Sequence, residues 1–133
     1  MNAQKLTQKS MEAIQAAQSV AVQYQNMQID QVHLLYALAD QEGGLISQLL
    51  TKMGVEPSKF IQSCEMEIAR LPKVTGSGRE PDKVYVSPDT DAALTEAEQT
   101  AARMKDEYVS VEHLFLGLMD KANAAAKRVF DSC

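Results

Sequence analysis

Apolar residues recur along the chain at steps of three and four, the spacing that places side chains on one face of an α-helix. Thr7 precedes the first such run, and its hydroxyl is suited to accept a hydrogen bond from the first turn of a helix. The pattern predicts six further helices, which begin close to Asp30, Gly44, Pro57, Ser87, Ser110 and Asn123. Glycine, proline and polar residues separate these runs. We therefore expect an all-α fold.

The stretch from Pro72 to Val86 departs from this pattern. It contains Gly76, Gly78 and Pro81 together with charged residues, a composition typical of an exposed connection. The residues at 84–86 could be briefly extended, but three residues do not make a sheet. We therefore predict a mobile linker over 72–86.

The helical pattern occurs twice. When the chain is shifted by the 80 positions that separate His33 from His113, residues 7–53 align with 87–133 without a gap. The expected helix starts coincide, and a stripe of alanines spaced by four coincides with a second one: Ala13, Ala17 and Ala21 with Ala93, Ala97 and Ala101. A stripe of small residues lets another helix approach closely.

This duplication predicts a helical bundle of two tandem pseudo-symmetric repeats within a single domain, 1–133. The first repeat is expected over about 7–71, the linker over 72–86 and the second repeat over about 87–133. Two copies that face each other would share one core and leave a groove along the seam between them.

Composition narrows the classes of partner. The net charge is −5, and the 13 Lys and Arg residues are scattered, whereas a nucleic-acid surface needs them clustered. No apolar run approaches the roughly 20 residues that cross a bilayer. The opening MNAQKLTQKS is too polar for a signal peptide. We expect no nucleic-acid partner, no membrane partner and a cytoplasmic location.

Candidate chemistry is sparse. His33 and His113 are the only histidines, and they allow two interpretations: a metal or general-base site, or rings packed at the seam between the repeats. Without an HExxH or paired-cysteine motif, packing is favoured. Cys64 and Cys133 match no metal or redox spacing, so we expect free thiols, with Cys64 filling the core.

Motifs that would indicate an enzyme are absent from the sequence: it has no GxSxG, GxxxxGK[ST] or GxGxxG. The carboxylate pairs at 65/67 and 96/98 are two positions apart, so their side chains diverge on a helix. We expect no catalytic residue in this chain. The seven methionines could form an adaptable binding surface, but ordinary packing is the favoured interpretation for most of them.

Four stretches carry a family resemblance: KLTQKSMEAIQAAQSVA, IDQVHLLYALADQEGGLISQLLTKMGV, ARLPKVTGSG and KDEYVSVEHLFLGLM. Together they resemble the Clp amino-terminal repeat domain of the AAA+ unfoldases, over nearly the whole chain. The LPKV-glycine segment resembles the ClpB-type disaggregases more than the protease-coupled ClpC and ClpA. The second copy stops before a counterpart of the fourth helix, which predicts a fragment of a longer protein.

The resemblance implies a domain that recruits unfolded or aggregated polypeptides to a hexameric motor. It implies no cofactor for this domain, ATP and magnesium in the motor domains of the parent protein, and a homohexameric parent that cooperates with the DnaK chaperone system. The alternative is a domain that docks folded adaptors for a protease-coupled Clp ATPase. A small independent enzyme or metal protein is a third, more distant interpretation.

The same resemblance implies three residues of chaperone function: Thr7, Asp106 and Glu112. The residues themselves indicate simpler roles, since Thr7 caps a helix and Glu112 lies in a first turn, where the helix dipole favours negative charge. The apolar groove side chains of the family do not map cleanly onto this chain, because Glu96, Thr100 and His113 occupy nearby positions.

Overall fold

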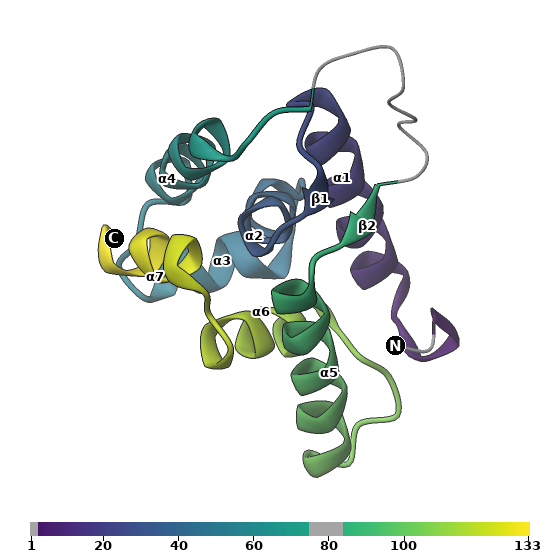
Figure 1. The fold of residues 1–133 in the computed structure, drawn as a ribbon. Helices are drawn as coiled ribbons and strands as arrows, with labels where there is room; N and C mark the ends of the chain where they lie inside the picture. The colour runs from purple at the N-terminus through teal and green to yellow at the C-terminus, as the bar shows by residue number, and fades with distance from the viewer. Residues whose placement is uncertain (1–2, 75–83) are drawn as a thin grey trace.

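The fold was analysed in a computed structural model, which describes residues 3–74 and 84–133 (Figure 1). A short 3-10 helix, Ala3–Lys5, precedes the first α-helix. Seven α-helices follow in the described residues: α1 (Gln8–Gln23), α2 (Gln31–Asp40), α3 (Leu45–Lys52), α4 (Pro57–Arg70), α5 (Pro88–Arg103), α6 (Val111–Asp120) and α7 (Ala124–Asp131). The predicted all-α fold is confirmed. At a shift of 80 positions the bounds of α1 and α2 match those of α5 and α6, and α7 begins and ends one residue before the counterpart of α3, as pseudo-symmetric repeats require.

Side chains at the predicted helix starts hold the first turns. Thr7 Oγ1 accepts a hydrogen bond from the Ser10 amide at 3.1 Å, and Ser87 Oγ accepts one from the Thr90 amide at 3.1 Å. Asn123 caps α7 in the same way. These caps satisfy amides that have no partner inside the helix, which is why local sequence located the helix starts well.

The predicted linker contains a strand. Tyr85–Val86 (β2) pairs in parallel with Gln28–Ile29 (β1), and Val84 is buried beside it, whereas residues 75–83 lie outside the described part of the chain. The expectation that this stretch forms no sheet is therefore wrong at its end. The pairing joins segments far apart in sequence, and a two-residue strand has no periodicity from which to predict it.

The segment that precedes the first helix of each half pairs with a segment of the other half. Leu6 bridges to Val109 in parallel, and Val86 pairs with Ile29, so the segment before the first helix of each half lies beside the segment before the second helix of the other. The Thr7 amide donates to the Val109 carbonyl at 3.1 Å, and the Ser87 amide donates to the Ile29 carbonyl at 3.0 Å. These reciprocal bonds connect the halves.

One continuous core lies between the helices. The two alanine stripes are buried in it, and Phe60, Phe115 and Phe130 form an aromatic cluster with ring centroids 5.9–6.2 Å apart. Cys64 is fully buried, as expected, and burial raises the pKa of its thiol. α4 packs against α2 and α7, so helices of both halves share this core (Figure 1).

Candidate functional site

The three residues that the family resemblance indicated lie around one loop. We call residues 106–110 the α6 entry loop, because they lead into α6. The Thr7 amide and the buried Ser10 hydroxyl both donate to the Val109 carbonyl of this loop, at 3.1 and 2.9 Å. Thr7 Oγ1 also donates to Ser10 Oγ at 3.0 Å. Thr7 therefore fixes the loop across the boundary between the halves.

Asp106 begins this loop, and Glu112 contacts it from the first turn of α6. His113 is buried, and its Nδ1 accepts a hydrogen bond from the Ser110 amide at 2.9 Å. Its Nε2 consequently carries the proton and donates to Asp106 Oδ2 at 2.8 Å. Glu112 accepts a hydrogen bond from the Ser110 hydroxyl. The geometry brings the three residues together, and their role in binding stays a prediction.

The first half contains the same arrangement. His33 Nδ1 accepts from the Asp30 amide at 2.7 Å, and His33 Nε2 lies 2.8 Å from Asn26 Oδ1. Asn26 and Asp106 correspond in the 80-residue shift, so each histidine connects a loop to the helix that follows it. Gln25 and Lys105, which also correspond, both have positive φ, 57° and 60°. The two histidines therefore have matching surroundings.

These contacts show which atoms the histidine rings bond. Each ring is buried, hydrogen-bonds to residues of its own half and caps a helix there, and its packing at the seam stays a prediction. A metal ion would need ring nitrogens that are already hydrogen-bonded. Within residues 3–74 and 84–133 no group of three or more His, Cys, Asp or Glu could hold a metal, and no helix has the length and apolar character to cross a membrane.

Acid is expected to destabilise the fold through His33. Burial lowers the pKa of this ring to about 4, against an opposing effect of Asp30. Because the unfolded ring titrates near 6.5, the unfolded chain binds a proton between these values and the folded chain does not. The contribution of the neutral ring is complete above pH 6.5 and decreases as the pH falls towards 4, by about 3 kcal/mol. Urea unfolding at pH 7 and pH 4.5 measures this loss.

Asn26→Asp isolates the effect of the histidine, since it gives His33 the carboxylate that His113 already has. A nearby negative charge favours the imidazolium, so the variant should lose about 1 kcal/mol less than the wild type between the two pH values. Gln28→Glu adds the same charge at an exposed position of the same loop and serves as the control. Equal pH dependence in the two variants would contradict the assignment to His33.

Comparison with known families identifies the fold. A family model described as the Clp repeat (R) N-terminal domain matches residues 5–133. This chain belongs to that family. The chaperone protein ClpB of Nitratidesulfovibrio vulgaris is 40% identical over 121 residues, which are 91% of this chain and 14% of that protein. The ClpB of Bacillus cereus is 38% identical over 121 residues, again 91% of this chain and 14% of that protein.

Solved structures agree with this Clp N-domain assignment. The Hsp104 N-terminal domain from Candida albicans superposes with a TM-score of 0.81 at 23% identity, covering 96% of this chain and 81% of that one. The N-domain of ClpV from Vibrio cholerae gives 0.79 at 19% identity, covering 96% and 76%. At these identities the structures show the fold alone, whereas the sequence relatives confirm the ClpB-type resemblance over the ClpC and ClpA alternative.

In this Clp N-domain the three residues near the expected groove positions, Glu96, Thr100 and His113, are polar. Arg103 Nη2 donates to Glu96 Oε1 at 2.9 Å and to Thr100 Oγ1 at 3.0 Å. The hydrogen bond from Arg103 lowers the pKa of Glu96 and so favours its charged form. His113 is buried and bonded to Asp106. An apolar ligand would therefore have few direct contacts at these three positions.

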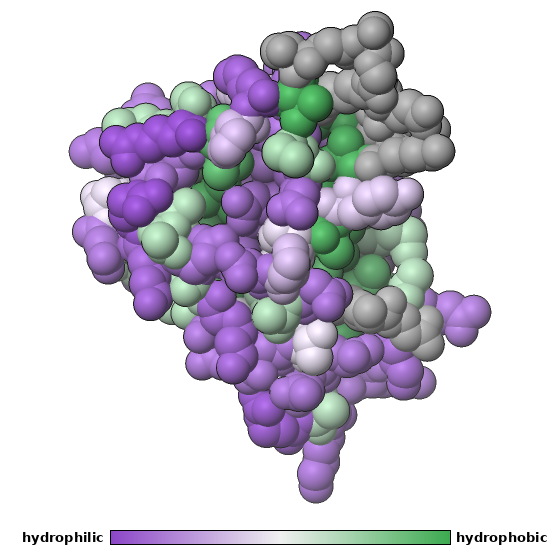
Figure 2. Space-filling model, in the orientation of Figure 1, coloured by the Kyte–Doolittle hydropathy of each residue, from purple (hydrophilic) through white to green (hydrophobic). Residues whose placement is uncertain are grey.

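The methionines within residues 3–74 and 84–133 lie on the surface of the Clp N-domain, so the preference for ordinary packing of most methionines is wrong. Six of them are at least 37% exposed: Met11, Met27, Met53, Met66, Met104 and Met119. Met104, which precedes the α6 entry loop, and Tyr108, which lies within it, are both about half exposed. Figure 2 shows a largely hydrophilic face on which hydrophobic residues gather around β1 and β2. Helical spacing alone did not distinguish exposed from buried methionines.

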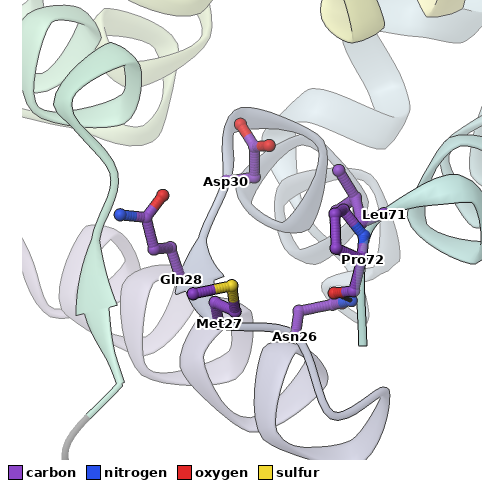
Figure 3. A pocket seen from close by; sticks show the side chains of 6 residues that line it. All are labelled: Asn26, Met27, Gln28, Asp30, Leu71 and Pro72. Atoms are coloured by element: carbon purple, nitrogen blue, oxygen red, sulfur yellow. Dashed lines mark hydrogen bonds between the residues drawn. The ribbon is translucent and has the colours of Figure 1, made fainter. Parts of the chain in front are cut away.

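A small pocket of about 120 Å³ lies at the loop of the first half. Figure 3 shows its lining: Asn26, Met27, Gln28 and Asp30 from the segment that leads into α2, and Leu71 and Pro72 from the end of α4. The chain leaving α4 therefore lies across this loop, and Asn26 is only 2% exposed.

Proposed function

We propose that this Clp N-domain is the substrate-binding domain of a ClpB-type disaggregase, and that it recruits unfolded or aggregated polypeptides at the α6 entry loop. One observation carries the proposal: Thr7, which is far from Asp106 and Glu112 in sequence, contacts the same loop that contains Asp106 and leads to Glu112 in the first turn of α6. The exposed Met104 beside the loop and the exposed Tyr108 within it offer adaptable apolar contacts.

In the proposed mechanism each domain binds substrate weakly, and several domains on one ring together bind it more tightly. Burying one exposed apolar side chain contributes at most about 1.5–3 kcal/mol, so a single domain should release its substrate readily. The chain spans about 14% of the length of its ClpB relatives. In the parent protein we propose motor domains that use ATP and magnesium, assembly as a cytoplasmic homohexamer and cooperation with the DnaK system. Six domains on one ring would raise the overall affinity by avidity.

Binding can be tested with a permanently unfolded polypeptide, such as reduced and carboxymethylated lactalbumin, titrated into the ¹⁵N-labelled domain. Amide resonances of the α6 entry loop and of the start of α1 should shift. Thr7→Ala should weaken binding several-fold, because the Ser10 hydroxyl, which donates to the loop, loses the Thr7 hydroxyl that orients it. Ser87→Ala removes the corresponding cap from the other half, at a similar cost of about 1 kcal/mol in stability, and should leave binding unchanged.

The proposal fails if no resonance near the loop moves at high polypeptide concentration. It also fails if Thr7→Ala and Ser87→Ala weaken binding equally, because the loss would then follow from stability alone.

A further inference from the structure

The α1–α2 loop of this chain already binds an extended segment, residues 72–74, which follows α4. The Val74 amide donates to the Gln25 carbonyl at 2.7 Å, and Asn26 Nδ2 donates to the Pro72 carbonyl at 3.3 Å. Lys73 forms an antiparallel bridge with Asn26, and its ammonium lies 5.7 Å from the centre of the Tyr24 ring. Leu71 and Pro72 lie opposite Asn26 and Met27 in Figure 3. Backbone bonds and one cation hold the segment.

The corresponding α5–α6 loop of the second half has no such segment bound to it among the described residues. Lys105 corresponds to Gln25 and has the same positive φ, but no described residue donates to its carbonyl. Asp106 corresponds to Asn26, and its side chain is 46% exposed where Asn26 is 2% exposed. Residues 102–108 are all exposed. An unpaired backbone edge of this kind is a template for another extended chain.

One chemical difference indicates what binds there. Asn26 donates through its amide, whereas an ionised Asp106 accepts only, and its Oδ1 has no partner among the described residues. Glu98 and Glu107 line the same small hollow of about 100 Å³, and its one basic residue is Lys5. The loop therefore favours a ligand that brings a positive charge.

We propose that residues 105–108 bind an extended polypeptide segment carrying Lys or Arg, added antiparallel to the loop as residues 72–74 add to residues 24–26. This rests on the proposed function and names the chemistry of its substrate. Backbone hydrogen bonds tolerate many sequences, and the basic side chain beside Asp106 supplies the preference. Met104, the counterpart of Tyr24, provides an exposed apolar contact next to it.

The probe is acetyl-Leu-Pro-Lys-Val-amide, whose sequence is that of residues 71–74, titrated into the ¹⁵N-labelled domain. Amide shifts should be confined to residues 104–109. A peptide with Glu in place of Lys should bind at least tenfold more weakly. Asp106→Asn should weaken binding of the Lys peptide about tenfold. The variant should keep the fold, because the Asn26–His33 pair shows that an amide oxygen can also support the histidine. Glu56→Gln removes the same charge at the exposed residue just before α4 and should change nothing.

The outcomes separate the two proposals. If the unfolded polypeptide binds while the Lys peptide shifts nothing, or shifts residues 25–27 or another surface, this inference is overturned and the proposed function stands. Equal weakening by Asp106→Asn and Glu56→Gln also overturns it, since net charge would then explain the binding. If neither the polypeptide nor the peptide binds, both proposals fall.

Discussion

Gly117→Ala should lower the free energy of unfolding by about 3 kcal/mol. A Cβ at this position would overlap the Ala93 carbonyl oxygen and would lie 3.0 Å from the Ala97 nitrogen. Both atoms belong to the backbone of α5, so no flexible side chain can move aside. The two helices would have to separate along the alanine stripe that joins them. The helix propensity gained by alanine, about 1 kcal/mol, offsets part of the cost.

The matched control is Ala37, which corresponds to Gly117 in the first half and is 3% exposed. Ala37→Gly should cost only about 1 kcal/mol, mainly helix propensity. Urea unfolding followed by circular dichroism measures both variants. If Gly117→Ala is as stable as the wild type, α5 and α6 are not held as closely as their geometry implies.

Gln31→Ala should be the most damaging single truncation among buried polar residues, at about 4 kcal/mol. Gln31 is fully buried, and its Nε2 donates to the carbonyls of Asp89 and Lys121 at 2.9 and 2.8 Å. Its Oε1 accepts from the Asn123 amide at 2.8 Å. Each buried backbone group left unpaired costs about 1–3 kcal/mol, and the cavity adds to this.

Gln31→Glu separates hydrogen bonding from volume. The carboxylate keeps the bond to the Asn123 amide but faces two carbonyls without a donor, so this variant should be unstable at neutral pH and recover partly when acid protonates it. Val111, the counterpart of Gln31 in the second half, gives the control, because Val111→Ala removes buried volume without a polar bond and should cost about 1–2 kcal/mol. Equal losses for Gln31→Ala and Val111→Ala would refute the role assigned to Gln31.

Sequence reasoning succeeded where the determining interaction is local. Thr7 and Ser87 each bond an amide three residues away, and Gly54 ends α3 with a φ of 82° that suits glycine. The 80-residue shift revealed the repeat because both halves must satisfy the same packing. The residues themselves gave Thr7 only a capping role, and the family resemblance supplied Asp106 and Glu112 as site residues.

Features that depend on distant contacts were missed. The shift aligns Gln31 with Val111, and a lone glutamine at a helix start looks like a surface residue until its three partners from the other half are seen. Each strand of the β1–β2 pair has only two residues, which is too short for a periodic pattern in the sequence. A usable signal was overlooked in one case: Asn26 and Asp106 both precede a histidine by seven positions, which indicates a repeated polar contact.

The pairing of the segment before α1 with the segment before α6 delays folding during synthesis, because its two partners are far apart in the chain. Ser10 bonds to the Val109 carbonyl, 99 positions further along the chain. At about 5–20 residues per second, a ribosome needs roughly 5–20 s to make that partner after Ser10 has been added. Until then Lys5, Thr7 and Ser10 lack their partner at Val109, so a domain that we propose to capture unfolded chains is itself, for those seconds, an incompletely folded chain.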